Sequence, residues 1–339
     1  ENHIRIVRDL AIRRELLHAA EEITRSIADV DEEDVNILVD QAEQKIFAVG
    51  DRLVGGQLIS AKELVENNID RILSQDGTNR GLRTGFLDLD EKQGFQPGDL
   101  VVLASRPSMG KTAFALNVME RVALESSKSV LLFSLEMPAD QLIQRLLSSH
   151  GRIRHDLLRS GRLDSGMRQR VTLSAGQLGN APIFIDDSSS PSLAEIRAKA
   201  RRLKRDGNLD LIMVDYLQLL TTKAENRQQE ISTISRTLKA IAKDLQVPVL
   251  ALAQLNRAAE KRDSHRPLLS DLRESGAIEQ DADMVMMLFR EEYYGQTEEN
   301  AGMGELILAK NRNGATGTVH LRFTKECMRF ENAVQVPAL

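Results

Sequence analysis

An eight-residue segment lies between a short apolar run and a stretch with helical spacing, and its residue types suit phosphate binding. The segment is Ser105, Arg106, Pro107, Ser108, Met109, Gly110, Lys111 and Thr112. Apart from Ser105, which stands in place of the first glycine, it matches a P-loop. In such a loop, backbone N–H groups at the start of a helix face phosphates, the lysine places its charge beside the β- and γ-phosphates, and the threonine hydroxyl binds Mg²⁺. The segment predicts a site for ATP and Mg²⁺.

Three further polar residues lie where apolar runs end, at Glu136, Asp215 and Gln254. Open α/β sheets bind ligands at the carboxyl ends of their strands, so these side chains are expected to meet the P-loop. There Asp215 would organise Mg²⁺, Glu136 would be the base that activates water, and Gln254 would sense the γ-phosphate. Each residue taken alone is also compatible with an ordinary polar residue at the end of a strand or the start of a helix.

Short apolar runs alternate with amphipathic stretches from Pro97 onward, which predicts an α/β fold with a mostly parallel sheet covered by helices. The predicted strands are Leu100–Ala104, Val130–Leu135, Ile183–Asp186, Leu211–Asp215, Val247–Ala253, Met284–Phe289, Leu306–Ala309 and Thr318–Phe323. The last two flank Asn313–Gly314 and predict an edge hairpin.

The first 80 residues differ, because their apolar positions recur at helical spacing. One helix is expected over residues 1–28, a second over about 34–52, and a third from Ser60, where Ser60 and Glu63 form a capping-box pattern. We expect residues 1–80 to be a small helical linker region, 81–330 an ATPase domain and 331–339 a flexible tail.

The overall composition limits the classes of protein to which this chain can belong. Of 339 residues, 42% are hydrophobic and 28% charged, an ordinary globular balance, and the net charge of −5 restricts any nucleic-acid binding to a local patch. Apolar runs fall well short of the roughly 18 residues of a membrane span. The single cysteine, Cys327, suits a reducing, cytoplasmic location. The N-terminal residues have no signal-peptide pattern and look like the middle of a longer chain.

Six segments, in order over about 85–330, together resemble the ATPase domain of DnaB-type replicative DNA helicases. They are SRPSMGKT (105–112), FSLEMP (133–138), LIMVDYLQLL (211–220), ALAQLNRAAE (251–260), LSDLRESGAIEQDADMV (269–285) and AKNRNGATG (309–317). The resemblance implies a RecA-like P-loop NTPase fold and a homo-hexameric ring that uses ATP to translocate on single-stranded DNA and unwind duplex DNA at the replication fork. It also implies a helicase loader and a primase as partners, and no association with a membrane. Residues 1–80 are similar to the end of the family's N-terminal region and its linker helix, with most of the collar domain missing.

The resemblance adds two groups of site residues. Lys310 and Arg312 look like the pair that reaches the neighbouring subunit's ATP, although as residues alone they also suit a solvated basic hairpin. The segment 271–276 is similar to the family's DNA-binding loop. Its predicted DNA-binding residues are Arg273, Glu274 and Gly276. Because the loop lacks an aromatic residue, we expect it to follow the DNA backbone with weak sequence preference.

Several interpretations stay open at the level of sequence. Lys223 and Arg227 lie in a second DNA-channel candidate that is equally compatible with a surface loop. Two basic clusters, at 152–170 and 197–205, suit either a solvated or intersubunit surface or DNA. The alternatives to a helicase are a RecA-like recombinase, which would coat DNA as a filament, and a regulatory P-loop ATPase, which would hydrolyse ATP without unwinding a duplex.

Overall fold

The structure is a computed structural model, and it describes residues 2–28, 38, 42, 45–46, 60–63, 65–66, 69, 81–220, 222, 226–256, 260, 262 and 264–333. The chain forms two compact units, Glu1–Gln75 and Asp76–Leu339. In the first, helix α1 spans Asn2–Ala28 and confirms the helix predicted there. Most of the predicted helix over 34–52 lies outside the described residues. At the start of the third predicted helix, the backbone N–H of Glu63 donates to Oγ of Ser60 at 3.1 Å, as expected of an N-cap.

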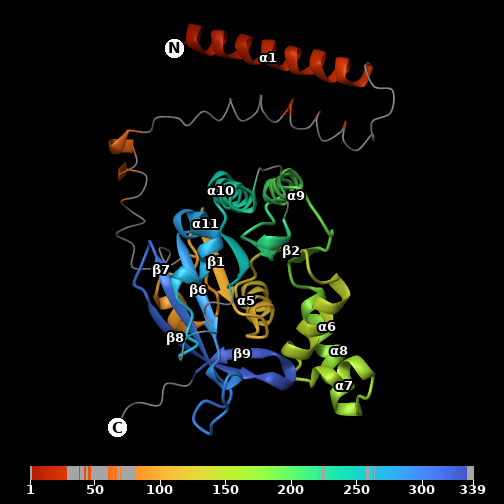
Figure 1. Ribbon diagram of the computed structural model, residues 1–339. Helices are drawn as coiled ribbons and strands as arrows, with labels where there is room; N and C mark the ends of the chain where they lie inside the picture. Colours follow the sequence, from red (N-terminus) through yellow and green to blue (C-terminus); the bar gives the residue numbers. More distant parts are fainter. Residues whose placement is uncertain are drawn as a thin grey trace. The chain divides into compact units, whose positions relative to one another are not determined.

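The second unit is built on one mixed sheet (Figure 1). The strand order in this sheet is β3-β2-β4-β5-β1-β6-β7-β8-β9. Its strands are β1 Leu100–Ser105, β2 Val130–Ser134, β3 Ile183–Asp186, β4 Leu211–Asp215, β5 Val249–Gln254, β6 Met284–Phe289, β7 Met303–Asn311, β8 Gly317–Thr324 and β9 Arg329–Asn332. Strands β1 to β6 are parallel to one another, and β7 to β9 are added antiparallel at one edge. The α/β fold, the eight predicted strands and the hairpin of β7 and β8 are confirmed, but β9 and not the hairpin is at the edge of the sheet.

Strand β9 lies where no strand was predicted, and it takes residues 331 and 332 out of the expected flexible tail. The tail prediction is wrong at these two positions, since Oδ1 of Asn332 also accepts a hydrogen bond from the backbone N–H of Leu87 at 3.0 Å. Its sequence, RFEN, has a single apolar residue, Phe330, so no alternation marks it as a strand. Residues 334–339 lie outside the described part of the chain.

Helices cover both faces of the sheet. They are α4 Leu87–Glu91, α5 Lys111–Glu125, α6 Ala139–His150, α7 His155–Ser160, α8 Ser165–Gly179, α9 Leu193–Arg205, α10 Arg227–Leu245 and α11 Gly276–Asp281. Short 3₁₀ turns are η1 Leu217–Leu219, η3 Leu269–Ser275, η4 Glu291–Tyr293 and η5 Lys325–Cys327. Helices α5 and α6 contribute to one buried cluster, and α9, α10 and α11 contribute to the other. Both faces of the central strands are therefore buried, which explains their continuous apolar runs.

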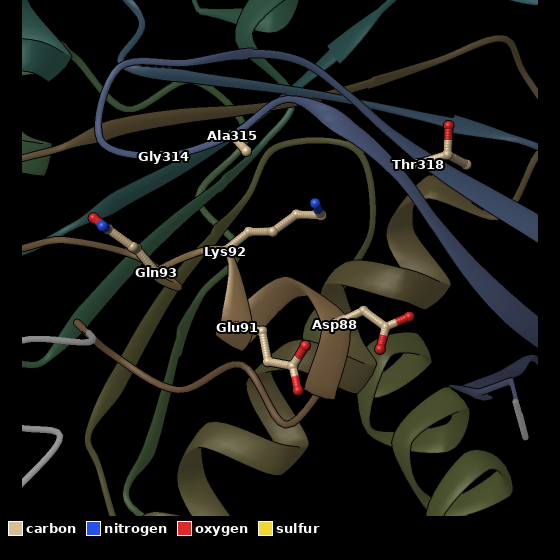
Figure 2. A pocket seen from close by; sticks show the side chains of 7 residues that line it. All are labelled: Asp88, Glu91, Lys92, Gln93, Gly314, Ala315 and Thr318. Atoms are coloured by element: carbon tan, nitrogen blue, oxygen red, sulfur yellow. The ribbon is translucent and has the colours of Figure 1, made fainter.

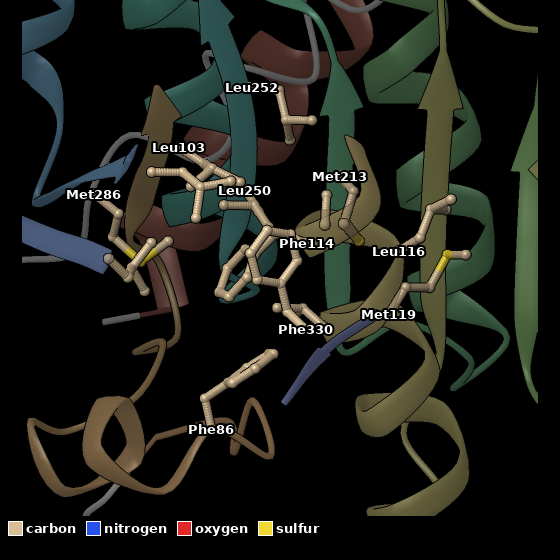
Figure 3. Close-up of a cluster of buried hydrophobic side chains, with 14 of the residues drawn as sticks. Phe86, Leu103, Phe114, Leu116, Met119, Met213, Leu250, Leu252, Met286 and Phe330 are labelled. Atoms are coloured by element: carbon tan, nitrogen blue, oxygen red, sulfur yellow. The ribbon is translucent and has the colours of Figure 1, made fainter. Parts of the chain in front are cut away.

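The P-loop helix α5 is anchored by aromatic packing (Figure 3). The ring of Phe114 stacks on Phe86 with ring centroids 4.7 Å apart and meets the edge of Phe330 at 5.7 Å. All three rings are fully buried. Paired aromatic rings add about 0.5–1.5 kcal/mol beyond their burial. The helix that begins at Lys111 is therefore held rigidly against the sheet.

Candidate functional site

The predicted P-loop joins the end of β1, at Ser105, to the start of α5, at Lys111. Its turn uses positive φ angles at Ser108 (67°) and Gly110 (93°). A Cβ atom on Gly110 would lie 3.0 Å from the Phe330 ring, so both the backbone conformation and the space require glycine there. Met109 is buried beneath the loop. The strand–loop–helix arrangement expected of a P-loop is present.

The strand ends that carry the other predicted residues are neighbours in the sheet. Asp215 pairs with Ser134, two residues before Glu136, and Gln254 pairs with Ser105. A cleft of about 590 Å³ opens at these ends. The predicted residues that line it are Ser105, Arg106, Pro107, Ser108, Gly110, Lys111, Thr112, Glu136 and Gln254. Met109 and Asp215 are buried below the cleft surface.

Buried Asp215 and the partly buried side chains of Lys111 and Thr112 form a polar cluster. Oγ1 of Thr112 donates to Oδ2 of Asp215 at 2.8 Å, and Nζ of Lys111 lies 4.0 Å from Oδ1. That Oδ1 atom is buried and accepts no hydrogen bond from the described residues. Burial raises the pKa of Asp215, and burial lowers the pKa of Lys111 against the opposing effects of Asp215 and Glu136.

These groups fit a magnesium nucleotide. Mg²⁺ prefers oxygen ligands such as a hydroxyl and a carboxylate, which Thr112 and the Oδ1 atom of Asp215 supply. A triphosphate would give the partly buried ammonium of Lys111 a closer anionic partner than the Asp215 carboxylate, which lies 4.0 Å away. The cluster is thus suited to bind phosphate and metal together.

Sequence reasoning did not identify several residues of the cleft. Arg145 of α6 lines it, and burial lowers the pKa of this arginine while Asp215 and Glu136 raise it. Arg145 lies within an amphipathic helix, where a charged residue gives no signal of its own. The cleft is also lined by Arg290, Tyr293, Phe323, Lys325 and Met328. Arg290 directly follows β6 and could have been found by the same strand-end argument that identified Glu136.

Arg106 connects the P-loop to the segment after Gln254. Its guanidinium donates to the backbone carbonyl of Leu255 at 2.7 Å and to Oε1 of Glu260 at 2.6 Å. Gln254 itself exchanges hydrogen bonds with Gln218, at 3.2 and 3.3 Å. Gln254, which is expected to sense the γ-phosphate, and the residues that follow it are therefore tied to both the P-loop and the turn after β4.

Lys310 and Arg312 do not lie at the cleft. Asn311, between them, pairs with Met284 at the amino end of β6, which lies beside Val101 of β1. Ser105 is four residues further along β1, or about 13 Å at about 3.3 Å per residue. The pair is thus at the amino edge of the parallel strands, opposite the P-loop of its own chain.

The predicted DNA-binding residues follow β5 and lead into α11. Arg273 and Glu274 fall in η3, and only their backbone is described. Gly276 begins α11 with an ordinary helical φ of −52°. A Cβ atom built on it would have no atom of the described residues within 4 Å, apart from its chain neighbours and the backbone of its own helix. Lys223 lies outside the described residues. Arg227 begins α10 and pairs with Glu230, so the chain itself engages this side chain.

Side chains of the two basic clusters make contacts within the chain. Arg152 pairs with Glu331 at 2.5 Å, Arg197 pairs with Asp244 at 2.5 Å, and Lys199 pairs with Asp186. Helix α9 buries Ile196 and Ala200 and carries its basic residues on the other side, as its amphipathic pattern predicts. These contacts are consistent with a solvated surface on α9.

Comparisons with known proteins agree with this geometry. The family model of the DnaB-like helicase C terminal domain matches residues 81–332. The chain is 44% identical to the replicative DNA helicase DnaB of Geobacillus stearothermophilus, over 98% of this chain and 74% of that protein. It is 46% identical to DnaB of Pasteurella multocida, over 97% of this chain and 73% of that protein.

Two solved structures are also similar. One is an ATPase domain that superposes with a TM-score of 0.78 at 40% identity, covering 81% of this chain and 99% of that one. The other is a DnaB-like replicative helicase that is described with its interactions with primase. It superposes with a TM-score of 0.84 at 35% identity, covering 98% of this chain and 78% of that one. No described helix is long and apolar enough to cross a membrane. The chain belongs to the DnaB-type replicative DNA helicases, which are ATP-dependent enzymes of DNA replication.

Proposed function

We propose that this chain assembles as a homo-hexameric ring on single-stranded DNA and hydrolyses Mg²⁺-ATP at a site completed by the neighbouring subunit. The observation that carries the proposal is the separation of the two halves of the catalytic set. The P-loop cluster lies at the carboxyl edge of the sheet, and Lys310 and Arg312 lie at the amino edge. A ring would bring the amino-edge pair of one subunit to the cleft of the next.

Within the cleft we assign roles by chemistry. Lys111 and the N–H groups of the P-loop bind the phosphates, and Thr112 and Asp215 hold Mg²⁺, which would neutralise charge on the β- and γ-phosphate oxygens. Glu136, a cleft-lining carboxylate two residues after the end of β2, takes the proton of the attacking water. Gln254 contacts the γ-phosphate and transmits its loss through the loop that Arg106 holds.

Arg312 of the neighbouring subunit stabilises the negative charge that develops on the transferring phosphoryl group, with Lys310 beside it. A guanidinium suits this task because it is always charged and presents a rigid fork of donors to phosphate oxygens. Hydrolysis then depends on assembly, since one chain alone supplies only the base and the phosphate-binding loop. DNA is held in the ring channel by Arg273, Glu274 and Gly276, with Lys223 and Arg227 as a second contact.

We further propose that residues 1–80 are a helical linker region, that residues from about 81 to 330 form the motor domain, and that a loader and a primase bind the assembled ring. The described helix α1 and the division of the chain near residue 75 support this organisation. The solved DnaB-like helicase that is described with primase supports the primase partner.

Mixing two inactive variants tests the proposed shared site. Glu136→Gln lacks the base but keeps Arg312, and Arg312→Ala keeps the base. Each homo-oligomer should bind ATP and lose most of its ATPase activity. Mixed rings should regain activity where an intact Glu136 meets an intact Arg312. If mixed oligomers form, as native mass measurement would establish, and no activity returns, Arg312 does not act on the neighbour's ATP.

A further inference from the structure

Arg312 is held in a defined position although its side chain is 51% exposed. One terminal nitrogen donates to Oδ1 of Asp283 at 3.3 Å, and the other donates to the backbone carbonyl of Gln280 at 2.8 Å. The backbone N–H of Arg312 also donates to the carbonyl of Asp283 at 2.9 Å. Asp283 thus contacts Arg312 at both ends, and the remaining N–H groups of the guanidinium are available to a phosphate.

Asp283 is itself fixed by buried contacts. It lies between α11 and β6 and is 6% exposed. Its Oδ2 atom accepts from the backbone N–H of Leu100, at the start of the P-loop strand, at 2.8 Å, and from Nζ of Lys239 of α10 at 2.5 Å. A carboxylate held by two donors on Oδ2 has little freedom to move, so its Oδ1 is a rigid acceptor for Arg312.

The hairpin that carries Arg312 is also held by contacts that do not involve the side chain of Asp283. Nδ2 of Asn311 donates to the backbone carbonyl of Lys92 at 3.3 Å, and Nδ2 of Asn313 donates to Oδ2 of Asp99 at 2.6 Å. Gly314 and Ala315 lie in a pocket beside Lys92 (Figure 2), and a Cβ on Gly314 would be 3.0 Å from the Lys92 carbonyl. The side chain of Asp283 therefore acts chiefly on the direction of the arginine, because other contacts place the hairpin backbone.

We propose that Asp283 is a positioning residue for Arg312. It holds the guanidinium at the end of α11 so that the arginine is already directed when a neighbouring cleft presents its ATP. Orientation matters because a misplacement of about 1 Å can lower a rate by about 100-fold. This proposal rests on the proposed trans action of Arg312.

The test compares Asp283→Asn with the parent in assembled protein, using steady-state ATPase kinetics. Asparagine keeps the shape and the acceptor for Leu100 but removes the charge that holds the guanidinium. We expect kcat to fall about tenfold or more, with KM for ATP changed less than about twofold, because the P-loop lies at the other edge. The matched control is Asp281→Asn, which removes the same charge two residues away, where the carboxylate accepts from Ser235 at 2.5 Å. It should keep kcat within about twofold of the parent.

A double-mutant comparison separates positioning from a merely structural role. If Asp283 acts through Arg312, the double variant of Asp283→Asn with Arg312→Ala has the same kcat as Arg312→Ala alone. A structural defect would lower kcat further, and additive losses overturn the proposal. The value of kcat is calculated per ATP-binding site, so that unfolded protein does not lower it.

Asp283→Asn removes a buried charge beside Lys239 and could prevent folding. In that case Asp283→Glu tests the same proposal. Glutamate keeps the negative charge and moves it by one methylene group, so a positioning role still predicts a loss of kcat at unchanged KM. A kcat within about twofold of the parent overturns the proposal. If instead Arg312→Ala itself retains full turnover, the proposed trans action fails, and that result is distinct from an insensitive Asp283.

Discussion

The two edges of the parallel strands carry charged groups of different character. At the carboxyl edge, Asp215 is buried and Lys111 is partly buried, and one carboxylate oxygen of Asp215 lacks a hydrogen bond from the described residues. At the amino edge, Lys310 and Arg312 donate to backbone carbonyls at the end of α11 and to Asp283. The first edge is therefore prepared to receive a ligand. The second is stable without one and can present a preformed group to another subunit.

Removal of charge should have different effects at the two edges, and the largest effect is expected at the P-loop. Lys111→Ala should weaken ATP binding at least about thirtyfold, since loss of one partner of a buried charge pair costs about 2–5 kcal/mol. Arg312→Ala should leave the dissociation constant for ATP within about twofold of the parent value, since the proposed contact of Arg312 stabilises charge that develops only during hydrolysis. Titration with a fluorescent ATP analogue measures both. Equal losses of affinity in the two variants would contradict the division between the edges.

One glycine at each edge offers a second comparison. Gly110→Ala places a methyl group against Phe330 at a φ of 93° and should lower both ATP affinity and the free energy of unfolding, the latter by about 2–4 kcal/mol. Gly314→Ala would approach the Lys92 carbonyl and should lower ATPase turnover while ATP affinity is retained. Urea denaturation and ATP titration separate these outcomes.

Gly161→Ala is the control for backbone strain at Gly110. Gly161 ends α7 with a φ of 70°, and the position of its Cβ is open, so only the conformational cost of about 1–2 kcal/mol applies. If Gly110→Ala is no more destabilising than this control and binds ATP normally, close packing against Phe330 does not shape the P-loop.

DNA binding should be affected at neither edge but in the segment that leads into α11. Arg273→Ala should weaken binding of single-stranded DNA about equally for different sequences and reduce the slope of log K against log salt by about 0.7 to 1. Fluorescence anisotropy at several salt concentrations measures the slope. An unchanged slope would place the DNA path elsewhere, and the basic clusters would be the next candidates.

The carboxyl edge was more accessible to sequence reasoning than the amino edge. Apolar runs that end in Glu136, Asp215 and Gln254 locate strand ends, and the side chains at such ends meet because parallel strands share a direction. The recombinase and the regulatory ATPase were left open by these motifs, and the family match sets both aside. The roles of the individual site residues stay predictions.

The positions that sequence reasoning missed depend on pairing between distant segments. Strand β9 has one apolar residue, and its place is fixed by Asn332 and Phe330 against α4 and α5. Asp283 belongs to a segment that resembles the family, but its contacts with Leu100, Lys239 and Arg312 join four parts of the chain. Sequence periodicity reports which face of an element is buried, and it does not report which polar groups meet.

The smallest predicted effect concerns the pH dependence of stability at the amino edge. Burial, followed by repulsion from Asp283, raises the pKa of Asp99 from 3.8 to about 6, against the opposing effects of Lys239 and Asn313. Because this pKa is higher in the folded state, folding favours the protonated carboxyl. The stability that this proton contributes is complete below about pH 4 and is lost as the pH rises through about 6.

Asp99→Asn removes the ionisable group and keeps an acceptor for Asn313. The melting temperature of this variant relative to the parent should therefore rise by a few degrees between pH 4.5 and 7.5. Glu91→Gln, which removes a negative charge from the exposed end of α4, should show a flat difference over the same range. Thermal unfolding followed by circular dichroism at several pH values makes the comparison. If the difference for Asp99→Asn is also flat, Asp99 does not titrate near 6, and the carboxylates at the amino edge are better stabilised than their burial implies.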